Sequence, residues 1–116
     1  MIRRPDPELF SALADPTRLD LVERLLSVPS LSTTQLTKGT GLTRQAIHKH
    51  LTVLEGVGLV AQERVGRRRL WSLDARPLGL VRDWSNRLRA VWAARFDQLE
   101  RLLAEGGPDD PRSVDP

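Results

Sequence analysis

The sequence contains no cysteine, which excludes disulfides, thiolate metal sites and cysteine nucleophiles. It has no apolar run near the ~20 residues of a membrane span, and no early apolar segment typical of a signal peptide. Only two histidines occur, His48 and His50, and neither has a serine and an aspartate in a catalytic arrangement. A glycine-rich phosphate loop is also missing. These absences argue against an enzyme and predict a soluble, cytoplasmic protein with no metal, no cofactor and no membrane partner.

Lysine is scarce as well, because arginine outnumbers it sixteen to two. The formal net charge of +3 is unevenly distributed along the chain. Residues 1–40 hold five basic and five acidic residues, residues 41–101 twelve and six, and residues 102–116 one and four. The positive charge therefore belongs to the middle of the chain, as a polyanion-binding surface requires. An arginine-rich genome would produce part of the same bias.

A chain of 116 residues is long enough for one domain with a real core. We expect that domain to span residues 1–105. The segment 106–116, GGPDDPRSVDP, is rich in glycine, proline and aspartate and predicts a disordered acidic tail.

The stretch Gly41–Leu54 organises the middle of the chain, because it predicts a turn followed by an amphipathic helix that Thr43 caps. Its outward face carries two cations, an amide and a histidine, which can donate to phosphates and base edges. His48 lies at the centre of that face, so we expect a DNA contact there rather than a merely solvated ring. His50 projects toward the apolar side and is expected to be a packing histidine.

Earlier segments carry helix start signals. Asp6 before Pro7 and Asp15 before Pro16 suit N-caps, and the second helix is expected to run to about Ser27. Ser32 and Gln35 fit a capping box, so a short helix precedes the one at Thr43 and completes a helix-turn-helix. The expected buried stripes of the first two helices are Leu9, Phe10, Leu13 and Ala14, then Leu19, Val22, Leu25 and Leu26. The expected solvent side of the second helix is Arg18, Asp20, Glu23 and Arg24.

Two strands are predicted next, Leu59–Val65 and Leu70–Leu73, joined by a tip of Gly66 and three arginines. A hairpin with an arginine tip directly after a helix-turn-helix predicts a wing. Side chains alternate along a strand, so the three arginines cannot all point the same way. We expect one or two of them to reach a phosphate or the minor groove. The alternative is a charged, solvated tip.

From about Leu78 to Ala104 the pattern predicts one long helix of roughly 40 Å. This is longer than so small a domain can cover, so the same helix of a second subunit is the expected partner. A terminal helix packed wholly within one chain, or an apolar ligand site lined by its aromatics, are the alternatives. The expected dimerisation residues are Trp84, Leu88, Val91, Trp92, Phe96, Leu99 and Leu103.

Several segments together resemble the ArsR/SmtB family of bacterial winged-helix repressors. They include ALADPTRL at residues 12–19, GLT at 41–43, HLTVLE at 50–55, GLV at 58–60 and RVGRRRLWSLD at 64–74. The terminal WAARFDQLE at 92–100 is similar to the last helix of one non-metal branch. The resemblance covers roughly residues 6–105. It implies a mostly helical winged helix-turn-helix with a long C-terminal dimerisation helix, acting as a homodimer on a near-palindromic operator.

The departures from that family exclude its best-known signals. Metal sensors carry a Cys-x-Cys pair before the recognition helix, whereas residues 31–36 here read LSTTQL. Other members bind zinc through histidines of the terminal helix, which has none here. We therefore expect no thiolate or histidine-rich metal site, and the release signal stays unassigned.

The predicted function is a sequence-specific DNA-binding regulator, most simply a homodimeric repressor on double-stranded DNA. Helix 43–55 would enter the major groove and the wing 64–69 would meet the backbone or minor groove. The alternative is a winged-helix interaction module whose basic face binds an acidic protein. The candidate DNA-binding residues are Thr43, Arg44, Gln45, His48, Lys49, Arg64, Arg67, Arg68 and Arg69.

Overall fold

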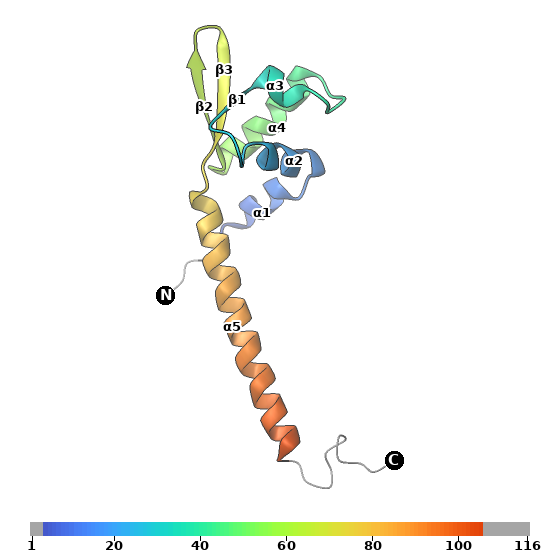
Figure 1. The fold of residues 1–116 in the computed structure, drawn as a ribbon, viewed down its shortest axis with the longest axis vertical. Helices are drawn as coiled ribbons and strands as arrows, with labels where there is room; N and C mark the ends of the chain where they lie inside the picture. Colours follow the sequence, from blue (N-terminus) through green and yellow to red (C-terminus); the bar gives the residue numbers. More distant parts are fainter. Residues whose placement is uncertain (1–3, 106–116) are drawn as a thin grey trace.

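A computed structural model describes residues 4–105, in which five helices accompany a small three-stranded sheet (Figure 1). The predicted fold class is confirmed, while the predicted tail at 106–116 lies outside the described residues. The elements are α1 (Pro7–Leu13), α2 (Pro16–Arg24), β1 (Leu31–Ser32), α3 (Thr33–Thr37), α4 (Arg44–Gly56), β2 (Val60–Val65), β3 (Arg68–Leu73) and α5 (Arg76–Ala104).

The predicted helix starts are confirmed, because each capping side chain accepts a backbone N–H of the first turn. Ser32 and Gln35 form the complete capping box, with hydrogen bonds of 3.1 and 2.8 Å. Thr43 accepts from the backbone of Ala46 at 3.1 Å. Local sequence therefore fixes where the two helices of the helix-turn-helix begin.

The core forms around the inner face of α4, whose Ile47, Leu51 and Leu54 are fully buried. Helices α1, α2 and α3 and the base of the wing cover this face. Burying such apolar side chains is the main stabilising contribution. The other buried core residues are Leu9, Ala12, Leu21, Val22, Leu25, Leu36, Leu59, Val60 and Trp71.

The prediction for α2 is wrong in its extent and in half of its buried stripe, because Val22 and Leu25 are buried as predicted but the other two residues are not. The helix ends at Arg24 rather than Ser27, and Leu21 is buried while Leu19 and Leu26 are exposed. This segment carries apolar residues on two overlapping stripes, so periodicity alone did not select the one that packs on α4. In α1, similarly, Leu9 is buried as predicted and Ala12 is buried as well, whereas Phe10 and Ala14, which were predicted to be buried, are exposed.

The sheet has the antiparallel order β1-β3-β2, and its first strand was not predicted. Two residues, Leu31 and Ser32, are too few for a visible alternation, and their pairing with β3 is a tertiary contact. The strand β3 begins at Arg68 rather than Leu70, so only Gly66 and Arg67 form the turn. Gly66 has φ of +62°, which favours glycine at this tight turn.

Helix α5 projects away from the rest of the molecule (Figure 1). It begins at Arg76, two residues earlier than predicted, where Asp74 accepts from the Arg76 backbone and guanidinium. The guanidinium hydrogen bonds lower the pKa of Asp74 to about 2. Near its start α5 packs on α1, with the Phe10 and Trp84 rings 5.5 Å apart. Among residues 4–105, no helix is both long and apolar enough to cross a membrane.

Candidate nucleic-acid interface

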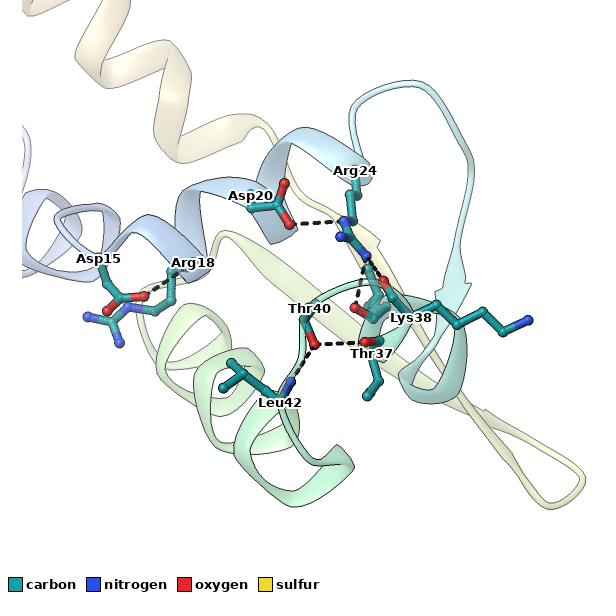
Figure 2. Close-up of polar contacts among 9 residues, drawn as sticks. Asp15, Arg18, Asp20, Arg24, Thr37, Lys38, Thr40 and Leu42 are labelled. Carbon is teal, nitrogen blue, oxygen red and sulfur yellow. Dashed lines mark hydrogen bonds and ion pairs between the residues drawn. The ribbon is translucent and has the colours of Figure 1, made fainter.

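The turn that sets the angle between α3 and α4 is held by its own threonines (Figure 2). The Thr40 hydroxyl donates to the carbonyl of Thr37 at 2.7 Å and accepts from the backbone of Leu42 at 3.1 Å. Gly39 and Gly41 both have positive φ, which lets the chain reverse within four residues. The start of α4 therefore follows a tight, hydrogen-bonded turn.

Arg24 of α2 completes this support, although the sequence placed it on the solvent side. Its guanidinium donates to the carbonyls of Leu36 and Lys38, at 3.1 and 2.7 Å, and pairs with Asp20 at 3.0 Å (Figure 2). Carbonyls at a helix C-terminus have no partner within the helix, so Arg24 satisfies groups that would otherwise need water. No periodicity signals such a contact, because it depends on how α2 packs beside α3.

A hollow of about 980 Å³ lies between the starts of α3 and α4 and the wing. It brings together every predicted DNA-binding residue except Lys49, which is exposed further along α4. The first turn of α3 also lines it, which no pattern in the sequence predicted. No aspartate or glutamate lines it. The lining residues are Ser32, Thr33, Thr34, Gln35, Thr43, Arg44, Gln45, His48, Arg64, Arg67, Arg68 and Arg69.

The register of the wing assigns its arginines to different faces. Arg64 lies opposite Arg69 and Gln62 lies opposite Trp71, so these residues share the face that meets α4. Arg68 lies opposite Val65 on the other face, so among the arginines that line the hollow it differs in orientation from Arg64 and Arg69. Like charges directly opposite each other are unfavourable. In the described part of the chain neither Arg64 nor Arg69 has a carboxylate within 4.0 Å, so this face lacks an internal counter-charge.

The single acid on the polar face of α4 is held away from the arginines. Both carboxylate oxygens of Glu55 accept from the Gln62 amide, at 3.0 and 2.9 Å, at the base of the wing. On the polar face of α4, the basic residues near the start of the helix are therefore separated from the acid at its end.

The two histidines of α4 have different surroundings. His48 is half-buried in the hollow, edge-on to Trp71 with ring centroids 5.7 Å apart, and Arg69 contacts its ring nitrogens. His50 lies on the opposite side of the helix, where its Nδ1 is 3.1 Å from an Arg18 nitrogen and 3.9 Å from an Asp15 oxygen. His50 is thus the packing histidine that its position predicts.

Arg18 joins three helices at this second site, and it was also predicted to face solvent. Its Nε donates to the Ala12 carbonyl at the end of α1 at 2.6 Å, while its backbone donates to Asp15. That backbone hydrogen bond, opposed by desolvation and aided by the nearby His50 and Arg18 charges, lowers the pKa of Asp15. The cluster fixes α4 against the α1–α2 corner. Within residues 4–105, no three His, Cys, Asp or Glu side chains come together as a metal site.

The predicted dimerisation residues follow α5 from its packed start to its free end. Trp84 is half-buried against α1, and Leu103 is half-buried near the end of the helix. Between them the stripe is exposed, and Leu102 adds to it. The exposed residues are Leu88, Val91, Trp92, Phe96, Leu99 and Leu102.

A helix-turn-helix followed by a basic antiparallel hairpin defines the winged helix-turn-helix class of DNA-binding regulators. The helix-turn-helix domain family matches residues 13–63, from the end of α1 into β2. A transcriptional regulator of Mycobacterium tuberculosis, Rv2034, is 34% identical over 107 residues, covering 92% of this chain and 95% of that protein. A probable mercury resistance operon repressor of Streptomyces lividans is 34% identical over 98 residues, which cover 84% of this chain and 77% of that protein.

Among solved structures, an ArsR-like transcriptional regulator from Rhodococcus sp. RHA1 matches with a TM-score of 0.70 and 29% identity. That match covers 82% of this chain and 89% of the other. The chain belongs to the ArsR/SmtB family of winged helix-turn-helix repressors, and it is a DNA-binding transcriptional regulator.

Proposed function

We propose that the protein is a homodimeric repressor that binds a near-palindromic operator, with one α4 in the major groove of each half-site. The observation that carries this proposal is the hollow between α3, α4 and the wing, which collects arginines from α4 and from both strands of the wing and no acid. A duplex presents closely spaced phosphates, so it would supply the counter-charge that this acid-free hollow lacks within the described residues.

The roles of individual side chains follow from their chemistry. Gln45 is suited to the N6/N7 edge of adenine, and Arg44 or Lys49 to guanine O6/N7 or a phosphate. Thr43, already the N-cap of α4, can also offer its hydroxyl to the backbone. Arg67 in the turn and Arg68 on the outer face of the wing are expected to meet phosphates or the minor groove.

The dimer is supported by the exposed apolar stripe of α5. Trp92 and Phe96 are 63% and 60% exposed, and large aromatic side chains in this number are unusual on a free surface. A second copy of α5 would cover them and hold two recognition helices at a fixed spacing. Repression would follow from occlusion of a promoter.

We assign the protein to a branch that does not sense metals through thiolates. The relative from Streptomyces lividans is named as a mercury resistance repressor, but this chain has no cysteine with which to bind a soft metal ion. Release from DNA would therefore follow another signal.

A gel-shift titration with DNA from upstream of the gene, against nonspecific competitor and at several salt concentrations, tests the proposal. Wild-type affinity should fall linearly on a log–log plot against salt. Arg68→Ala should flatten that slope by about 1 or less without changing sequence preference, and Gln45→Ala should relax preference at particular bases. Arg101→Ala removes the same charge from the far end of α5 and is the matched control.

Two outcomes would count against the proposal. If Arg68→Ala and Gln45→Ala bind every sequence like the wild type, the assigned surface is wrong. If the wild type prefers an acidic protein and shows no sequence preference on DNA, the basic face serves protein interaction instead.

A further inference from the structure

We infer that Arg69 and His48 act as one base-reading unit, so that Arg69 belongs to the reading surface of α4 and not to the phosphate contacts of the wing. The inference rests on the proposed function and deepens it, because it separates Arg69 from its neighbours Arg67 and Arg68. A run of three arginines gives no such distinction by itself.

The side chains of Arg69 and His48 are in direct contact. Arg69 Nη1 lies 3.2 Å from His48 Nε2 and 3.4 Å from His48 Nδ1. An arginine can only donate, so at most one of these two contacts is a hydrogen bond, and it goes to the ring nitrogen that carries no hydrogen. The guanidinium is thus attached to the middle of the recognition helix although it comes from β3.

The buried side chain of Trp71 supports the contact between His48 and Arg69. His48 meets the edge of Trp71, which is fully buried and whose indole N–H donates to the Thr33 hydroxyl at 2.9 Å. Trp71 and Arg69 lie two positions apart on β3 and share one face of the sheet. The column Thr33–Trp71–His48–Arg69 therefore connects α3, the wing and α4.

Arg69 keeps hydrogen-bond donors that no group in the described residues uses. Contact through Nη1 leaves the Nε and Nη2 donors of Arg69 available, and the described residues hold no carboxylate within 4.0 Å of it. A planar guanidinium with free donors matches guanine O6/N7. Holding an arginine on a ring also reduces the side-chain entropy lost on binding. Arg68 faces the other side of the wing, which fits a contact to the DNA backbone.

A half-site library, in which each operator position is varied in turn, tests the inference on the full-length protein. His48→Ala and Arg69→Ala should each lose about tenfold in preference at the same base pair, and the double variant should lose little more than either single one. Arg69→Lys should keep the salt slope of the wild type but lose the preference, because lysine lacks the planar fork. Arg68→Ala, the matched control, should lower affinity for all sequences alike.

A second measurement examines the contact without DNA. In NMR spectra of the free protein, the chemical shift of the Trp71 indole N–H should change in His48→Ala and Arg69→Ala and should stay unchanged in Arg68→Ala. Thermal unfolding of each variant shows that it is folded; Arg69 is exposed, so its removal should change the midpoint little.

The inference is overturned if Arg69→Ala behaves like Arg68→Ala, or if the losses of the two single variants add in the double variant. Either result would leave the proposed function intact, because the wild type would still select its operator. If the wild type itself shows no sequence preference, the proposed function fails and this inference fails with it.

Discussion

Replacing Trp92 by alanine should weaken association of the two subunits of the proposed homodimer far more than it affects folding of the monomer. The indole is 63% exposed in the single chain and lies in the exposed stretch of α5. Within the described residues it has no aromatic partner, unlike Trp84 on Phe10. Its removal should therefore lower the stability of the monomer only slightly, but it should strongly weaken the association with any partner that covers it.

The expected magnitude follows from the exposed area. A tryptophan side chain buries on the order of 250 Å², so an exposure of 63% leaves roughly 160 Å² for a partner to cover. At ~25 cal/mol per Å² this area is worth about 4 kcal/mol per subunit as an upper estimate. Interfaces return only part of such area terms, and central aromatic residues contribute ~2–4 kcal/mol on truncation. The variant loses the indole from both subunits, so the dimer dissociation constant should rise about 10³- to 10⁶-fold.

Sedimentation velocity over a range of protein concentrations measures this change directly. Arg101→Ala is the control, because it lies half a turn around α5 from Trp92 and should leave dissociation unchanged. Operator affinity of Trp92→Ala should fall in parallel, since a single subunit makes few phosphate contacts. An unchanged dissociation constant for Trp92→Ala, or a wild type that stays monomeric at micromolar concentration while binding its operator, would refute the reasoning.

Three further changes test the fold that presents the site. Ile47→Ala opens a cavity beneath the recognition helix and should lower the free energy of unfolding by ~2–5 kcal/mol in urea titrations. The exposed Val53→Ala on the same helix should change it little. Ser32→Ala removes the cap of α3 and should cost about 1 kcal/mol by the same measurement. The pKa of Asp74 is lowered from 3.8 to about 2, so its stabilising contribution is complete above 3.8 and is lost as pH falls toward 2. Asp74→Asn should therefore flatten the acid side of a plot of urea midpoint against pH, and an unchanged acid limb would contradict this assignment.

The sequence predicted the elements whose signals are local. Helix starts at Asp6, Asp15, Ser32 and Thr43 could be located because a capping side chain and the N–H groups it satisfies lie within three residues. The division of α4 into a buried and a polar face was also visible, since a helix repeats every 3.6 residues. These two patterns located Thr43, Arg44, Gln45 and His48 of the hollow, and the arginine run at 64–69 located its four wing residues, but the contribution of the first turn of α3 was missed.

Tertiary structure decided what depended on partners distant in the chain. Arg18 and Arg24 are charged residues of the kind expected on a solvent-exposed face. Arg18 instead contacts the Ala12 carbonyl and His50. Arg24 instead donates to the carbonyls of Leu36 and Lys38. The choice of Leu21 over Leu19 as the buried residue of α2 also required knowing which side met α4.

The arginine wing shows the same division between sequence and structure. Composition gave the charge of residues 64–69, because a run of arginines needs no fold to be recognised. The register of β2 against β3 then placed Arg64 and Arg69 on the face toward His48 and Arg68 on the other. A shift of one residue would have exchanged them, since side chains alternate along a strand. The sequence by itself thus determined that residues 64–69 carry a concentrated positive charge, and only the pairing of the wing strands decided on which face each arginine lies.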